Sequence, residues 1–235
     1  MTFQNTVRVS QAAGIVGEIA FDGPYRAEPA ILRSVDAAYN VIGRAYTAVA
    51  AEDGVAKAGG AATDPFAGIL VNPLVYATAG TVAGALTPTL VLPNETQAEL
   101  LKMGTILVSL AAAANIGDLV TYDTTTGALS SLAPEAAFTA AQALGVLTVS
   151  AITAGKIGIG SVIKNASGQV LGTVISLGTG TGGTGTYNLD TSATVGSAAM
   201  TANSVAVSGQ AVVPNTKVVR QNIPSAGLAY IQLTN

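Results

Sequence analysis

Turn-forming residues divide this chain of 235 residues into short apolar runs. Val, Ile, Thr and Tyr cluster in these runs, and Gly, Pro, Asn or Asp separates them roughly every 8 to 12 residues, as in β-sandwiches and β-barrels. No window sustains the 3.6-residue apolar period of an amphipathic helix. The pattern therefore predicts an all-β fold of the barrel or sandwich type, with little helix.

One hairpin is predicted with particular clarity. Leu119–Tyr122 and Ala128–Leu132 flank the turn Asp123–Gly127, where a glycine can supply positive φ. The same reasoning predicts further strands, which are Phe3–Val9, Val41–Val49, Phe66–Val71, Leu74–Ala77, Leu86–Leu92, Thr105–Leu110, Leu147–Ile152, Ser161–Ile163, Val170–Leu177, Ser204–Gln210, Lys217–Val219 and Leu228–Leu233.

Two segments are candidates for short helices or ordered loops. Asn94–Met103 contains a capping box, in which Thr96 is followed by Glu99, and Gly104 would end it. The Ala-rich segment Pro134–Leu144 has Pro and Glu where a first helical turn favours them.

Composition changes near residue 146. From there to about residue 201 the chain is rich in Gly, Thr and Ser, whereas strand-like patterns return after it. We interpret residues 147–201 as a small inserted β-module that faces outward. Residues 1–146 and 202–235 then form the main β domain, which we expect to carry the binding surface.

The residue types present exclude much chemistry. The chain has no His, Cys or Trp, which removes imidazole acid–base catalysis, thiol nucleophiles, disulfides and any metal site built from His or Cys. Only 10% of residues are charged, against roughly 25% in ordinary soluble domains. A protein with so little charge tends to associate with other protein chains.

Nucleic acid and membranes are not expected partners. The formal net charge is -3 with no basic run, so nothing would neutralise phosphates. No segment approaches the ~20 continuous apolar residues of a membrane-spanning helix, and the N-terminus lacks the apolar core of a signal peptide. We expect a product made in the cytoplasm.

A glycine motif has an ordinary explanation. Gly178, Gly180 and Gly183 match the G-x-G-x-x-G pattern that approaches a pyrophosphate. However, Thr184–Leu189 begins no helix and no acidic residue follows about 20 positions on, which a ribose site requires. A Gly/Thr turn within the β-module is the better interpretation, and we expect no cofactor.

Carboxylates are the only remaining catalytic candidates. The pairs considered are Glu52 with Asp53, Asp22 with Glu28, and Glu95 with Glu99. Their surroundings predict solvated charges in turns, because a sugar-cleaving dyad would be expected among aromatics. Asp118 and Asp123 could be proposed as calcium ligands, but their spacing matches no EF-hand and a hairpin turn explains both. We therefore expect neither a metal site nor an enzyme.

Several short segments together point to one family. They are Phe3-Gln4-Asn5-Thr6-Val7, Ala13-Gly14-Ile15-Val16-Gly17-Glu18-Ile19-Ala20, Pro24, Val41-Ile42-Gly43-Arg44-Ala45, Phe66-Ala67-Gly68-Ile69-Leu70-Val71-Asn72-Pro73, Met103-Gly104, Asn115-Ile116-Gly117-Asp118-Leu119-Val120, Val213-Pro214-Asn215-Thr216-Lys217-Val218-Val219-Arg220 and Gly227-Leu228-Ala229. In order and number these segments resemble the structural cement, or head decoration, proteins of tailed bacteriophages. The Gly/Thr-rich module departs from the compact pattern of that family.

The resemblance implies a virion protein that binds the exterior of an assembled head and bridges neighbouring capsomers. The implied partners are the major capsid protein and further copies of the chain, as a dimer or a trimer. Phe3, Val7, Arg8 and Val9 are candidate capsid contacts, because this segment could add a strand to a capsid sheet, although it could equally be an edge strand of its own barrel.

Two other functions stay open from the sequence. A phage tail or fibre component would share the β-rich composition. A carbohydrate-binding module would need exposed aromatics, for which the candidates are Tyr25, Tyr39, Tyr46 and Tyr187.

Overall fold

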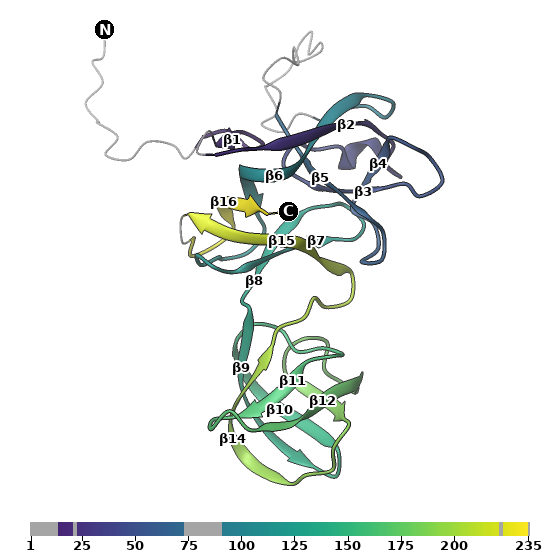
Figure 1. The fold of residues 1–235 in the computed structure, drawn as a ribbon. Helices are drawn as coiled ribbons and strands as arrows, with labels where there is room; N and C mark the ends of the chain where they lie inside the picture. Colours follow the sequence, from purple (N-terminus) through teal and green to yellow (C-terminus); the bar gives the residue numbers. More distant parts are fainter. Residues whose placement is uncertain (1–13, 21–22, 73–90, 221–222, 235) are drawn as a thin grey trace, which may run out of the picture.

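The computed structural model describes residues 14–20, 23–72, 91–220 and 223–234. Sixteen β-strands and a single 3-10 turn, Ala37–Tyr39, make up the regular structure of these residues, which confirms the all-β prediction (Figure 1). None of the described segments is a helix of the length and apolarity needed to cross a membrane. The predicted strands Phe3–Val9 and Leu74–Ala77, and most of Leu86–Leu92, lie outside the described residues.

Strand β6, Gln97–Leu110, organises the main part of the molecule because two rings of strands share it. Its first half pairs with β2 and β5, and its second half pairs with β16 and, through Leu110, with β8. Gly104 lies at the changeover with a φ of +128°, a conformation that disfavours every residue with a side chain. The short strand β1, Ile19–Ala20, also pairs with the second half of β6.

The first ring runs β6-β16-β15-β7-β8 and returns to β6. The predicted hairpin is confirmed, since β7 and β8 pair in antiparallel register, with Tyr122 opposite Leu129. The other strands of this ring are β7 (Leu119–Asp123), β8 (Leu129–Leu132), β15 (Gln210–Arg220) and β16 (Gly227–Leu233). Ile106, Val120, Val218 and Ile231 are buried in its core.

The second ring runs β6-β2-β4-β3-β5 and also returns to β6. Its other strands are β2 (Arg26–Leu32), β3 (Ala45–Ala48), β4 (Val55–Ala58) and β5 (Phe66–Leu70). A separate core of buried side chains, including Leu32, Tyr46, Leu70 and Leu100, fills it. Each ring closes its own hydrogen-bonding edges, as barrels do.

The Gly/Thr-rich part forms a third, six-stranded closed barrel in the order β10-β13-β12-β11-β14-β9 (Figure 1). Its strands are β9 (Glu135–Ala143), β10 (Val146–Ala154), β11 (Val162–Asn165), β12 (Val170–Leu177), β13 (Gly185–Leu189) and β14 (Val195–Asn203). The barrel thus begins earlier than the predicted module boundary at residue 147, because β9 pairs with both β10 and β14.

Both candidate helices are strands, so that prediction was wrong. Residues 97–103 of the first form the start of β6, and most of Pro134–Leu144 is β9. In β9 the inward residues Ala136, Phe138 and Ala140 alternate with more exposed ones. Alanines occupy both faces, so the two-residue period was invisible in the sequence, and pairing with two neighbours overrides helix propensity. The predicted strand Ser204–Gln210 is mostly the loop between β14 and β15.

Candidate functional surfaces

The predicted capsid contacts Phe3, Val7, Arg8 and Val9 lie outside the described residues. The first described residue, Gly14, lies close to Leu107 and to the Tyr230 hydroxyl, so close that a Cβ added at Gly14 would be 3.6 Å from that oxygen. Tyr230 lies on β16, whose buried residues Ala229 and Ile231 point to the opposite, core side. Gly14 therefore lies on the outer side of the first ring.

Three of the carboxylates considered as catalytic candidates, Glu28, Glu52 and Glu95, form ion pairs. Glu95 and Glu52 both pair with Arg33, whose Nε lies 2.7 Å from Glu95 Oε1. The Arg33 hydrogen bond lowers the pKa of the Glu95 carboxyl, and a hydrogen bond from Lys102 lowers that of Glu28. A general acid at neutral pH needs a raised pKa, which is the opposite direction. Asp22 lies outside the described residues.

The two aspartates considered as calcium ligands accept hydrogen bonds from backbone N–H groups. Asp118 Oδ2 accepts a hydrogen bond of 2.8 Å from the Asn115 N–H. Asp123 Oδ1 accepts from the N–H groups of Thr125 and Thr126 at 3.0 and 2.7 Å, which closes the β7–β8 turn. Within the part of the chain that the structure describes, no cluster of three acidic side chains could hold a metal ion.

The Gly-x-Gly-x-x-Gly segment wraps a tyrosine instead of a phosphate. Tyr187 is fully buried in the barrel, and its hydroxyl donates to the Gly183 carbonyl at 2.7 Å and accepts from the Gly182 N–H at 3.1 Å. Gly180 lies against the ring, so a Cβ there would approach Tyr187 Cζ to 2.3 Å. The absence of a side chain at Gly180 allows this close approach, and the segment connects β12 to β13 within the β-module, as the interpretation of a turn predicted.

The tyrosines proposed for sugar binding are mostly unavailable. Tyr46 and Tyr187 are fully buried, and Tyr39 is partly buried. Tyr25 alone of the four candidates is exposed, by 54%. A single ring does not make the stacking platform that the sequence argument required.

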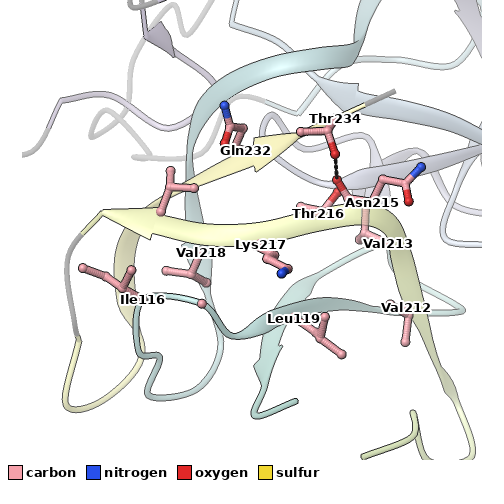
Figure 2. Close-up of a pocket in the computed structure, with 12 residues that line it drawn as sticks. Ile116, Leu119, Val212, Val213, Asn215, Thr216, Lys217, Val218, Gln232 and Thr234 are labelled. Atoms are coloured by element: carbon pink, nitrogen blue, oxygen red, sulfur yellow. Dashed lines mark hydrogen bonds between the residues drawn. The ribbon is translucent and has the colours of Figure 1, made fainter.

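A groove lies on the first ring (Figure 2). It measures about 650 Å³ and follows β15 where this strand separates from β7. Its lining is mainly apolar, with Lys217 as the one charged side chain. The lining residues are Ile116, Gly117, Leu119, Val212, Val213, Asn215, Thr216, Lys217, Val218, Val219, Gln232 and Thr234. Sequence reasoning missed this groove because it depends on an irregularity of pairing.

Comparison with protein families then identifies the chain. The model of the family described as "Structural cement protein (E217 gp24/Pam3 gp6)" matches residues 3–234. The chain belongs to this structural cement protein family. No curated protein sequence matches it significantly.

A chain from "The capsid of Myoviridae Phage XM1" has a similar solved structure. It is 13% identical to this cement protein, with a TM-score of 0.46, and the match covers 100% of this chain and 99% of that one. The family match over residues 3–234 alone assigns the chain to the cement proteins. The cement protein is accordingly a structural phage capsid protein, as the sequence resemblance predicted.

The cement protein also has a rigid corner on the second ring. Ser34 Oγ donates to Asn40 Oδ1 at 2.6 Å and accepts from the Ala58 N–H at 2.8 Å, while Asn40 Nδ2 donates to Asn94 Oδ1 at 2.8 Å. Asn94 Nδ2 in turn donates to the Ser34 carbonyl at 3.0 Å. Buried polar networks with satisfied partners hold a single local conformation.

This corner presents Val35, which is 96% exposed. Its neighbours are fixed: Arg33 binds Glu95 and Glu52, and the Asp36 carboxylate accepts from the Ala38 N–H at 2.9 Å. An exposed aliphatic side chain between two anchored residues loses little entropy when it is covered. Val35 is therefore a second candidate contact on the cement protein.

Proposed function

We propose that this cement protein binds the exterior of a phage head and bridges neighbouring capsomers of the major capsid protein, so that it stabilises the expanded shell. The observation that carries the proposal is the family match over residues 3–234. We further propose that the chain is made in the cytoplasm of the bacterial host, and that neither nucleic acid nor a membrane is a partner.

Mass action explains how such binding stabilises a head. A ligand that binds the expanded lattice and not the unexpanded one lowers the free energy of the expanded state. Many copies on one particle add avidity when each copy contacts more than one capsomer. The low charge of the chain supports the proposal, because a protein with only 10% charged residues suits contacts with other proteins.

We place the capsid-binding surface on the two rings and the N-terminal segment. Phe3, Val7 and Val9 alternate with polar residues, and Arg8 is the one charge among them. Such a segment can add a strand to the edge of a capsid sheet, where main-chain hydrogen bonds supply affinity and alternate side chains supply specificity. Pairing within its own first ring, where β1 already pairs with β6, is the competing arrangement.

We place the six-stranded barrel on the outer side of the bound protein. It joins the rings through two neighbouring links, Ala133–Pro134 and the loop 204–209, whose Ser204 N–H donates to the Pro134 carbonyl at 3.0 Å. An insertion attached at one end of a domain leaves the remaining surface available for binding. Association of copies into a dimer or a trimer is part of the same proposal.

Co-sedimentation with heads tests the function. Purified protein is mixed with expanded heads and with unexpanded procapsids of the phage that encodes it, and bound copies are counted on a gel against the major capsid protein. We expect saturable binding to expanded heads alone, at a fixed ratio. Absence of binding to both particles would refute the proposal, and immunogold labelling of tails would then test the fibre alternative.

Deletion of residues 1–10 tests the N-terminal contact. We expect head binding to be lost while the circular dichroism spectrum and the thermal midpoint stay unchanged, since the described strands begin after this segment. Replacing Phe3 and Val7 by Ser should weaken binding as well, whereas Gln4→Ser on the opposite face should not. Unchanged head binding after the deletion would show that residues 1–10 do not contact the capsid.

A further inference from the structure

The ladder between β7 and β15 is interrupted in the middle of the first ring. Val212 pairs with Thr121, and the next pair joins Lys217 to Leu119. Over this stretch β15 advances by more residues than β7, so β15 bulges away from its neighbour. The groove of about 650 Å³ lies at this separation (Figure 2).

Hydrogen bonds within the protein hold the bulge in place. Asn215 has a φ of +48°, and its carbonyl accepts hydrogen bonds from the N–H of Thr234 at 2.9 Å and from the Thr234 hydroxyl at 3.0 Å. The Gly117 N–H donates to the Val218 carbonyl at 2.8 Å just beyond it. A preformed groove costs little to order on binding.

The side chains in the groove are suited to an extended apolar chain. Ile116 and Val212 are 58% and 39% exposed, so a bound chain could cover apolar surface on both. Leu119 is partly buried and continues the apolar lining toward β7. Alternate apolar side chains of a bound strand would cover these surfaces.

The charge of Lys217 indicates what kind of segment the groove could bind. Lys57 and Lys102 each pair with a carboxylate, whereas Lys217 has no carboxylate partner among the residues that the structure describes. The Asp118 side chain belongs to the neighbouring turn, but it is buried and accepts from the Asn115 N–H. An exposed lysine in an apolar groove favours a partner that brings a carboxylate.

We propose that this groove is a second attachment site, which takes an extended segment of the major capsid protein. The segment carries apolar side chains at alternate positions and a carboxylate that faces Lys217. The inference rests on the proposed function for the identity of the partner, and it is independent of the contact assigned to residues 1–10.

A peptide titration tests the inference directly. The probes are overlapping 12-residue peptides that cover the major capsid protein of the same phage, added to the full-length protein with labelled methyl groups. We expect a small set of peptides with alternating apolar residues and a carboxylate to shift the methyl signals of Ile116, Val212 and Val218. If no peptide shifts these signals, the inference is wrong.

Variants separate the groove from unspecific binding. We expect Lys217→Glu to weaken the best peptide by about 5-fold, because it replaces an attraction by a repulsion at an exposed site. Val212→Thr should weaken it by about 3-fold through lost apolar contact, with the shape of the side chain retained. The matched controls Lys164→Glu and Val170→Thr change an exposed lysine and an exposed valine of the six-stranded barrel, and should leave peptide binding unchanged. Equal binding by Lys217→Glu and the wild type would overturn the inference.

A peptide of residues 1–13 of this chain is a further probe. It carries Arg8 and no acidic residue, so we expect it not to shift the groove signals. If it shifts them more strongly than every capsid peptide, the groove belongs to the chain's own N-terminal segment and the inference fails.

Head binding distinguishes this inference from the proposed function. If wild-type protein sediments with expanded heads but no capsid peptide enters the groove, the groove inference fails and the cement function stands. If a peptide binds as expected but no protein sediments with heads, the groove recognises a segment of the capsid protein, but the proposed attachment to heads is refuted.

Discussion

The six-stranded barrel and the two rings reach stability in different ways. The barrel contains four charged residues, Glu135, Lys156, Lys164 and Asp190, of the 10 basic and 13 acidic residues in the chain. All five ion pairs among the described residues lie in the rings or beside them. The barrel depends on its apolar core and on hydrogen bonds of Thr, Ser and Tyr, such as those around Tyr187. Closed β-structure therefore does not require a charged surface.

The two regions also differ in how they are connected. The rings share β6, so neither can open without disturbing the other. The barrel closes entirely on its own strands and has a separate core. Local stability follows such cooperative units. We therefore expect the pair of rings to unfold as one unit and the barrel as another.

Leu101→Ala should give the largest effect. Leu101 is fully buried in β6 and pairs with Ala27 on one side and with Ile69 on the other. Removal of a buried leucine leaves a cavity and costs about 3 kcal/mol. Urea denaturation should show this loss in the transition of the rings, identified by hydrogen exchange of β6 peptides.

The barrel serves as the internal control for that experiment. Exchange of β10 peptides should keep its wild-type midpoint, because no strand of the barrel pairs with β6. A single transition in which both sets of peptides lose protection together would show that the two regions form one cooperative unit, contrary to the comparison.

Gly180→Ala should give an intermediate effect, confined to the barrel. The added Cβ would approach Tyr187 Cζ to 2.3 Å and the hydroxyl oxygen to 2.6 Å, so the ring or the loop must move. Overpacking of this kind costs about 2 kcal/mol. Gly183→Ala is the matched control in the same loop, since nothing lies within 4 Å of a Cβ there. Equal midpoints for the two variants would show that the loop does not hold the Tyr187 ring.

The sequence predicted the fold class well because β-structure leaves local signals. The turn at Asp123–Gly127 fixes a hairpin by its own chemistry, and β12 was predicted with the bounds it has, Val170–Leu177. The failures are also local in origin. Ala-rich β9 shows no alternation, and β2 contains Arg26, Glu28 and Pro29, which hid it among turn residues. That β6 belongs to both rings depends on which strands pair with each other, and turn residues do not encode strand pairing.

The candidate surfaces were less predictable than the fold. The residues of the motif Asn115–Val120 and of Val213–Arg220 carried the family resemblance, yet nothing in either segment shows that the two flank one groove. The groove arises where β15 and β7 are out of register, which depends on how the two strands pair and not on the sequence of either strand alone. Val35 likewise looks like an ordinary loop residue until the Ser34 network fixes its position.

Acid should give the smallest effect, and it should act on the rings. Hydrogen bonds from Lys102, Lys57 and Arg33 lower the pKa values of Glu28, Asp64 and Glu95, respectively. A carboxyl with a lowered pKa in the folded state stabilises that state above its unfolded pKa of about 4, and this contribution is lost as the pH falls through the folded value. Glu95 is exposed and Glu28 and Asp64 are only partly buried, so solvent keeps the contribution small.

Thermal unfolding between pH 7 and pH 3 measures this difference. The thermal midpoint of the rings should decrease once the pH drops below about 5. The thermal midpoint of the barrel should decrease less, because the barrel has only Glu135 and Asp190 to protonate. Glu95→Gln should reduce the pH dependence of the rings, because it removes a carboxylate that Arg33 holds ionised. If the thermal midpoints of both regions decreased equally, the ion pairs of the second ring would not explain how the two regions differ in their response to acid.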